Sequence, residues 1–246
     1  MKSENSSRFT LRFGLAMAIA VLSILLATPT ALFAQQGDQN NWVYPPDSVV
    51  FGMTYGDWLA AYWQYILAFP ASANPATDTT GAICNLGQSG GPVFFLNGSF
   101  ASGVLITRSC TVPAGKALYI PNVGCECSTA ESAPFHGDTG QEMRACTLAF
   151  TDGIDVRTLK VTVDHKKIQN LGSYRAQSPL YNFIMPADDN ILGVPGVSSG
   201  SSVADEYGVI LKPLSPGFHV IHFEGAFVTG PGAGASFSVT YYLTVQ

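Results

Sequence analysis

The chain has 246 residues, a formal net charge of −5 and only 12% charged residues. This charged fraction is about half of the usual ~25%. Because the chain has no run of clustered cations, it lacks an electrostatic basis for binding nucleic acid, and we expect no nucleic-acid partner. Its surface is expected to be polar through uncharged side chains, which is common in exported β-rich proteins and untypical of disordered ones.

Residues 1–34 have the pattern of a secretory signal peptide. Arg8 and Arg12 precede a short apolar run, Pro29 ends the run, and Ala34 stands before a polar stretch. The pattern predicts cleavage and a secreted or periplasmic protein. The alternative is an uncleaved anchor, because the same segment is just long enough to cross a bilayer. Pro29 and the missing basic stop favour cleavage, so we expect no stable membrane span in the mature chain.

A helix is the first element expected after a polar lead-in at residues 35–53. It covers residues 55–69, and Thr54 with Asp57 resembles a capping box at its start. Its aromatic and aliphatic side chains form two adjacent rows with almost no charge, which predicts burial against a sheet. Aromatic rows also bind sugars or lipids, but packing in the core is the simpler interpretation. We expect one domain over residues 54–246.

Strands dominate the rest of the chain. Apolar runs at residues 92–96 and 103–107 flank Asn97 and Gly98, a dipeptide typical of tight hairpins. A third strand is expected at residues 116–120. These three strands would form a meander.

The second half combines one short helix with further strands. Residues 123–140 are expected to be irregular, and the helix covers residues 139–150 with Asp138 as its cap. Short strands joined by Gly/Pro turns predict a mainly β fold, an antiparallel β-sandwich or jelly-roll-like domain with one buried aromatic-rich helix and one short helix. The later strands are expected at residues 158–163, 180–185, 207–211, 218–224 and 236–245, the last three in one antiparallel sheet.

All five cysteines lie downstream of the predicted signal peptide. In an oxidising compartment disulfides are expected, and an odd count leaves one thiol over. Cys84 and Cys110 flank the predicted hairpin and can come close in space, while either Cys125 or Cys127 can reach Cys146 on the following helix. No second Cys or His motif completes a tetrahedral metal site with Cys125 and Cys127.

Several sequence blocks carry a resemblance to known proteins. With Trp58 and Trp63 upstream, they are Asn-Pro-Ala-Thr-Asp-Thr-Thr-Gly at residues 74–81, Gly-Gly-Pro-Val-Phe-Phe-Leu at 90–96, Arg-Ser-Cys-Thr-Val-Pro-Ala-Gly-Lys at 108–116 and Phe-His-Val-Ile-His-Phe at 218–223. The chain resembles a group of bacterial exported proteins known only as hypothetical, without an assigned activity. The resemblance spans most of residues 50–246 and implies a single exported domain. It also implies that four cysteines form the paired set, namely Cys84, Cys110, Cys127 and Cys146. Cys125 is then the spare thiol.

Two groups of residues are candidates for chemistry. His222 and Glu224 would share one strand face, where they could ligate a metal or act as an acid/base pair, although a solvated sheet face is the favoured explanation. Asp188, Asp189 and Asn190 offer oxygen ligands suited to Ca²⁺, but they lack the spacing of an EF-hand loop. No cofactor is predicted, and Ca²⁺ is the metal that the sequence weakly suggests. The remaining loop carboxylates are Asp78, Glu126 and Asp138.

Two functions follow from these features. The favoured one is a non-catalytic binding or envelope-associated module, stabilised by two disulfides, with a glycan or envelope component as its partner. The alternative is an exported hydrolase acting on a polysaccharide or ester, with His136, His222, Glu224 and loop carboxylates as candidates for its site. Convergence of these groups in a concave pocket would favour the enzyme.

Overall fold

The computed structural model describes residues 41–246, and the predicted signal peptide at residues 1–34 lies outside the described residues. The described residues belong to one folded unit, Asp38–Gln246. Its α-helices are α1 (Tyr55–Leu67) and α2 (Gly140–Thr151). Short 3₁₀ turns lie at Ala71–Ala73, Val156–Thr158 and Leu171–Tyr174. The strands are β1 (Val93–Phe95), β2 (Leu105–Val112), β3 (Ala117–Ser128), β4 (Lys160–Val163), β5 (Lys166–Lys167), β6 (Arg175–Gln177), β7 (Tyr181–Ile184), β8 (Ser199–Leu211), β9 (Gly217–Ala226) and β10 (Ser236–Val245).

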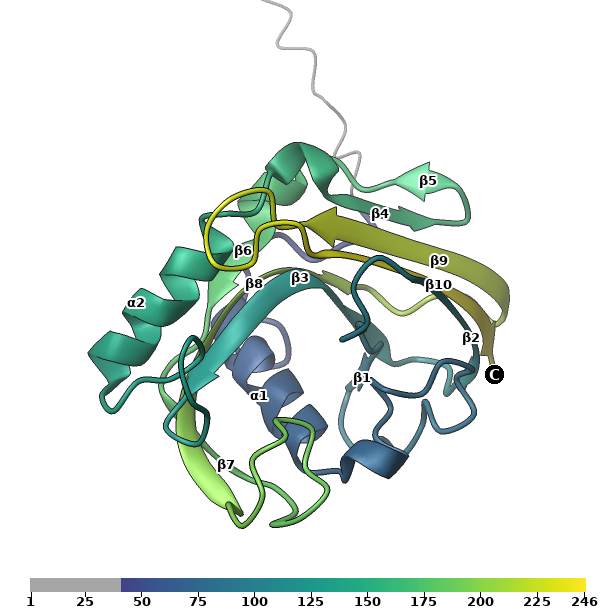
Figure 1. Cartoon of the computed structure of the whole chain (residues 1–246). Helices are drawn as coiled ribbons and strands as arrows, with labels where there is room; N and C mark the ends of the chain where they lie inside the picture. Colours follow the sequence, from purple (N-terminus) through teal and green to yellow (C-terminus); the bar gives the residue numbers. More distant parts are fainter. Residues whose placement is uncertain (1–40) are drawn as a thin grey trace, which may run out of the picture. The chain divides into compact units, whose positions relative to one another are not determined.

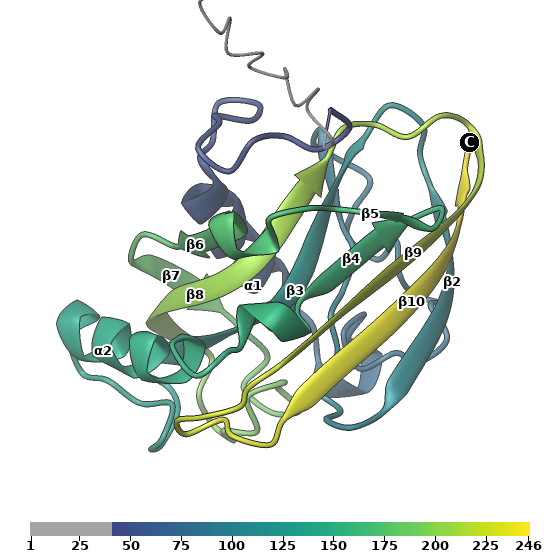
Figure 2. The same ribbon diagram turned by 90° about the horizontal axis from the view of Figure 1, so that it is seen from above.

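The strands form two sheets of five strands each. The central sheet has the order β1-β3-β8-β6, and β7 also pairs with β8. The outer sheet has the order β2-β10-β9-β4-β5. Figure 1 shows the outer sheet lying over β3 and β8, with α1 on the other side of the central sheet and α2 at its end. In Figure 2 the outer sheet is seen almost face-on, with β3 and β8 behind it.

The burial pattern along each strand explains this layering. Nearly every residue of β3 and β8 is buried, which is expected for strands covered on both faces. In β2 and β10 buried residues alternate with more exposed ones, because one face of the outer sheet meets the core and the other meets solvent. The fold is therefore mainly β and sandwich-like, with a helix as a third layer.

The sheets are mixed, so the expectation of a purely antiparallel sandwich is wrong. β1 pairs with β3 in parallel, and β2 pairs with β10 in parallel. The expected hairpin at Asn97 and Gly98 is also absent, because β1 and β2 belong to different sheets. Arg108 takes both carbonyl oxygens of that dipeptide as hydrogen-bond acceptors, which holds the segment as a crossing between the sheets.

Other boundaries differ from the expected ones for similar reasons. β3 continues to Ser128, into a stretch expected to be irregular, because β8 pairs with it along its whole length. β8 lies in the central sheet, so only β9 and β10 of the three expected C-terminal strands pair with each other in the outer sheet. Long-range pairing thus decides elements whose local patterns are weak.

Both helices begin with complete capping boxes. In α1 the Thr54 hydroxyl accepts from the backbone N–H of Asp57, and the Asp57 carboxylate accepts from the Thr54 N–H, as expected. In α2 the cap is Thr139 with Glu142, one residue later than expected. The aromatic rows of α1 pack in the core: the Tyr62 ring stacks on Tyr119 with centroids 5.3 Å apart. Neither helix of residues 41–246 is long and apolar enough to cross a membrane.

Two disulfides connect these elements. Cys84–Cys110 joins the loop before β1 to β2, with Cα atoms 6.0 Å apart. Cys127–Cys146 joins β3 to α2, with Cα atoms 6.2 Å apart. These are the four cysteines that the resemblance implies. Cys125 is a free thiol, buried beneath α2.

Candidate functional site

His222 and Glu224 lie together on the solvent side of the outer sheet. His222 Nε2 is 3.0 Å from Glu224 Oε2, and His222 Nδ1 is 2.9 Å from the Thr240 hydroxyl on β10. Lys160 of β4 approaches the same carboxylate at 3.4 Å. Partial burial would raise the pKa of Glu224, but the hydrogen bond with His222 and the nearby Lys160 ammonium outweigh it and lower that pKa. The group is a cross-strand polar cluster on a sheet face rather than part of the deeper pocket described below.

His136 lies elsewhere, in the connection between β3 and α2. Its Nε2 is 3.1 Å from Asp138, and its Nδ1 is 2.7 Å from the carbonyl oxygen of Glu131. The Asp138 carboxylate raises the pKa of this exposed imidazole. His136 and His222 therefore belong to separate clusters, and the two histidines expected for a hydrolase do not form one site.

Asp189 connects its loop to the turn at Ser72, and Asn190 holds the loop itself together. The Asp189 carboxylate accepts hydrogen bonds from the backbone N–H and the hydroxyl of Ser72. The Asn190 amide bonds to the backbone of Val194 on both its oxygen and its nitrogen. Across residues 41–246, no three His, Cys, Asp or Glu side chains are grouped closely enough to hold a metal.

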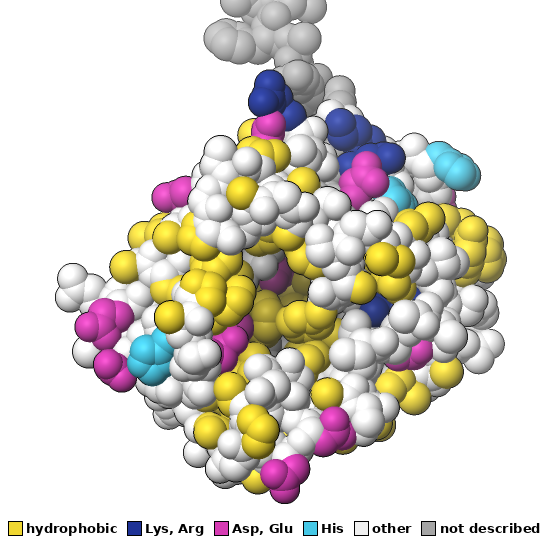
Figure 3. Space-filling model, in the orientation of Figure 1, with side chains coloured by type: hydrophobic (Ala, Val, Ile, Leu, Met, Phe, Trp, Pro, Cys, Tyr) yellow, Lys and Arg dark blue, Asp and Glu magenta, His cyan; other side chains and the backbone are white. Residues whose placement is uncertain are grey.

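A pocket follows the free edge of β3. β1 pairs only with the first residues of β3, up to Tyr119, whereas β3 continues to Ser128. Six consecutive β3 residues, 121–126, line two adjoining hollows of about 90 and 330 Å³. The hollows share Trp63, Phe100, Gly124 and Phe237, so we treat them as one feature, the β3-edge pocket. Figure 3 shows the opening on this face, with hydrophobic side chains around it and acidic atoms inside.

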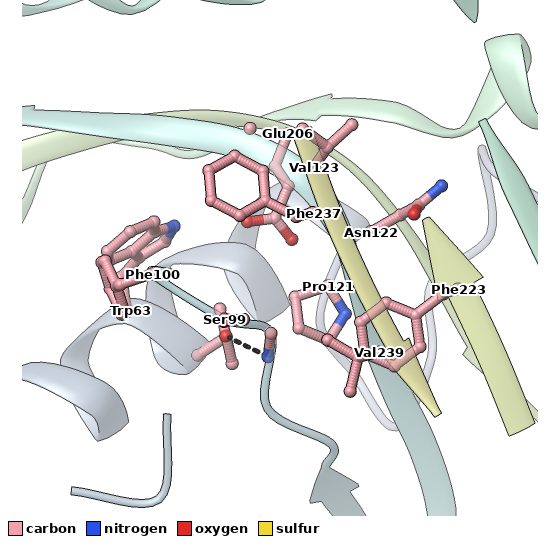
Figure 4. A pocket seen from close by; sticks show the side chains of 13 residues that line it. Trp63, Ser99, Phe100, Pro121, Asn122, Val123, Glu206, Phe223, Phe237 and Val239 are labelled. Atoms are coloured by element: carbon pink, nitrogen blue, oxygen red, sulfur yellow. Dashed lines mark hydrogen bonds between the residues drawn. The ribbon is translucent and has the colours of Figure 1, made fainter. Parts of the chain in front are cut away.

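Aromatic side chains from several elements form most of the walls. Trp63 comes from α1 and contacts Phe100 edge-on, with ring centroids 6.2 Å apart. Figure 4 shows these two rings on one side of the smaller hollow and Phe223 and Val239 of the outer sheet on the other. Phe135, Phe150, Phe227, Phe237, Ile191 and Leu192 line the larger hollow.

Glu126 and Glu131 lie side by side in the larger hollow. Glu126 is fully buried, and burial together with the neighbouring Glu131 carboxyl raises its pKa well above the usual range. Burial also raises the pKa of Glu131. The hydroxyl of Ser202 donates to Glu126, and that of Ser128 donates to Glu131 at 2.9 Å. Both carboxyls therefore release their protons at a higher pH than a free glutamic acid side chain does.

Glu206 of β8 is a third carboxyl, in the smaller hollow. Burial raises its pKa to about 8, although the Tyr119 hydroxyl, which donates to it at 3.2 Å, partly offsets the rise. The Trp63 indole N–H is turned toward this carboxyl but makes no hydrogen bond of normal geometry within the described residues. At Gly124 a Cβ atom would lie 2.4 Å from the Cα of Glu206, so glycine is needed for β3 to pass this close to β8.

Some buried polar atoms of the β3-edge pocket lack an ordinary hydrogen-bond partner among residues 41–246. Within residues 41–246, both side-chain polar atoms of Asn122 are buried without hydrogen-bond partners, and Trp63 Nε1 and Glu126 Oε1 have only a neighbouring carboxyl, Glu206 and Glu131 respectively, beside them. Asn122, Trp63 and Glu126 all line the pocket. Because buried polar groups are normally satisfied, these atoms are available to a bound molecule. An apolar cavity with a few such groups is typical of a small-molecule site.

The sequence identified only part of this pocket. Glu126 is among the loop carboxylates noted above, but it lies in a strand, and Glu131 and Glu206 were not singled out. One local signal existed for Glu206: it follows Asp205 inside an otherwise apolar run, where adjacent carboxylates are unusual. Asp205 is the structural one of the two, because Arg175 binds it through two nitrogens at 2.8 and 2.9 Å.

No family model and no curated protein matches this chain. Among solved structures, PbICP-C in complex with falcipain-2 is 13% identical, with a TM-score of 0.24, and the match covers 63% of this chain and 100% of that one. The cysteine protease inhibitor EhICP2 from Entamoeba histolytica is 11% identical, with a TM-score of 0.21, covering 58% and 94%. Similarities at this level do not bear on fold or function.

Proposed function

We propose that the protein is an exported binding module that takes a small, mainly apolar molecule into the β3-edge pocket. The observation that carries this proposal is the pocket itself: about 330 Å³ in its larger part, walled by aromatic rings and containing unsatisfied polar atoms. Its size lies at the lower end of the range of ligand sites, which suits a molecule of one to three rings.

A non-catalytic role fits this geometry better than hydrolysis. The Thr240–His222–Glu224 arrangement on the outer sheet resembles a nucleophile with its base. It lies on a regular sheet face, where the backbone N–H groups pair with neighbouring strands and offer no oxyanion hole. A glycan fits the β3-edge pocket less well than an apolar molecule, because its hydroxyls need many polar partners.

Export and kinship are further parts of the proposal. The signal-like pattern of residues 1–34 and the two disulfides support a secreted or periplasmic location. The sequence blocks around Cys84 and Cys110 support kinship with the hypothetical bacterial exported proteins. An envelope component that releases or presents small apolar molecules would be a suitable partner.

Binding of N-phenylnaphthylamine, a neutral dye that fluoresces in apolar surroundings, tests the proposal. We expect saturable binding to the purified protein, and Phe100→Ala should weaken it by about tenfold, because an aromatic wall contributes roughly 1–2 kcal/mol. Phe100 is 49% exposed, so the substitution should leave the fold intact.

Phe218→Ala is the matched control. Phe218 is 65% exposed and stacks on Tyr242 at 6.0 Å on the outer face, away from the pocket. Its loss should leave dye binding unchanged. Equal effects of the two substitutions, or no saturable binding at all, would rule out the β3-edge pocket as the binding site.

A further inference from the structure

The acidic side chains that line the β3-edge pocket have no basic side chain beside them in its lining. Three of its lining side chains are carboxyls: Glu126, Glu131 and Glu206. None of its lining residues is Lys, Arg or His. The buried guanidinium of Arg108 is engaged with backbone carbonyl oxygens and the Tyr241 hydroxyl, and it does not line the pocket.

Aromatic faces and unpaired carboxyl oxygens are complementary to the same kind of ligand. A cation attracts the electron-rich face of an aromatic ring, and several rings around one site form the cages that recognise organic ammonium groups. Trp63, Phe100 and Phe237 border both hollows, between Glu206 on one side and the Glu126–Glu131 pair on the other. Apart from the neighbouring Glu131 carboxyl, Glu126 Oε1 has no partner among the described residues and can accept from an N–H.

From this juxtaposition we infer that the ligand of the β3-edge pocket is an organic amine, an ammonium group carried on a compact apolar body. The inference rests on the proposed binding function and specifies its ligand class. The ammonium group lies against the Glu126–Glu131 pair, and the apolar body lies among the rings. An anionic ligand is disfavoured, because it would meet three carboxyls and no cation.

Binding of the amine displaces a proton from the carboxyl pair. The groups around the pair are Cys125 and Ser128 of β3, His136 of the following connection, Ser202 of β8 and Tyr181 of β7. His136 is the titratable base among them, and its contact with the pair is a hydrogen bond to the backbone oxygen of Glu131. The ammonium keeps its own protons and pairs with the carboxylate, while the proton of the pair leaves to solvent. Amine and proton therefore compete for the site.

Competition with the bound dye distinguishes the ligand classes. Phenethylamine and phenethyl alcohol have the same apolar body and nearly the same size, and only the amine is charged. At about pH 8 we expect the amine to bind at least about tenfold more tightly than the alcohol. Its affinity should rise by up to about tenfold per pH unit as the pair deprotonates, whereas the affinity of the alcohol should stay constant.

Carboxyl variants locate the effect. Glu131→Gln, at a partly exposed position, should weaken amine binding by about tenfold or more and leave the alcohol within about twofold. Glu126→Gln should do the same, and circular dichroism checks that both variants are folded. Glu224→Gln, on the outer sheet, is the matched control and should change neither ligand.

Each outcome decides the inference. If the alcohol binds as tightly as the amine, or Glu131→Gln leaves the amine unaffected, the amine assignment fails while the binding proposal stands. If neither compound displaces the dye and the dye itself does not bind, both fail. Stronger binding of phenylpropionate than of phenethylamine would also overturn the assignment.

Discussion

At the scale of single residues, Glu206 is buried, and burial disfavours the charged form of its carboxyl group. Its carboxyl is fully buried beside Tyr119, and its pKa is raised to about 8 from an ordinary value of 4.5. Between these two pH values the folded protein keeps a proton that the unfolded chain gives up. The free energy of unfolding must therefore fall as the pH rises through this window.

Glu206→Gln should remove this fall in the free energy of unfolding, because the glutamine side chain does not ionise. The amide oxygen still accepts from the Tyr119 hydroxyl, so we expect stabilisation of about 2–3 kcal/mol at about pH 8 and little change at about pH 4. Denaturant unfolding at the two pH values measures it. Glu224→Gln should act in the opposite direction, because the pKa of Glu224 is lowered by His222 and Lys160 and its carboxylate stabilises the fold above its ordinary pKa. Equal effects of Glu206→Gln at both pH values would contradict this account.

At the scale of elements, Arg108 of β2 holds three segments together. It is fully buried and donates to the carbonyl oxygens of Ala76 at 2.9 Å, Asp78 at 2.6 Å and Gly98 at 2.8 Å. It also donates to the Tyr241 hydroxyl of β10 at 2.9 Å. Its planar guanidinium reaches all of these acceptors at once, which an ammonium group cannot do.

Arg108→Lys should therefore destabilise the protein by about 3–5 kcal/mol, because several buried carbonyl groups would lose their donor. Arg157→Lys is the control: Arg157 pairs with Asp155 at the surface, its side chain is 87% exposed, and its replacement should cost less than about 1 kcal/mol. Urea unfolding of the three proteins compares them. Similar midpoints for both variants would show that Arg108 is not a structural hub.

Elements whose signals are local could be predicted from the sequence. Thr54 with Asp57 indicates the start of α1, because both partners of the capping box lie within one turn. Nothing local links Leu105 to Ser238, whose strands pair in parallel across more than half of the described chain. Asn97-Gly98 looked like a hairpin because the competing partner, Arg108, acts through tertiary contacts. The β3-edge pocket escaped prediction for the same reason, since its walls come from distant segments.

At the scale of the whole molecule, the two disulfides and the predicted export are linked, because disulfides persist in oxidising compartments. Four cysteines are paired and Cys125 is buried, where burial raises the pKa of its thiol. The native protein should therefore not react with a thiol reagent, and the denatured, unreduced protein should react once.

Intact-mass measurement of the protein recovered from outside the cytoplasm tests both features. We expect the mass of a chain that begins at Gln35, lower by four hydrogens than the mass of the fully reduced chain because of the two disulfides. After denaturation, one thiol should be labelled. A mass that retains residues 1–34 would contradict cleaved export, and labelling of three or more thiols would contradict the two disulfides. Recovery from the cytoplasm alone would contradict export altogether.

The unpaired edge of β3 has a consequence for self-association. A strand with free N–H and C=O groups is a template on which another chain can add a strand, and such edges lead to aggregation. Here Trp63, Phe100 and Phe237 line the pocket at this edge, so their side chains occupy space that an added strand would need. The same walls that admit a small molecule thus keep other polypeptides out, so removing them should make the protein more prone to polymerise.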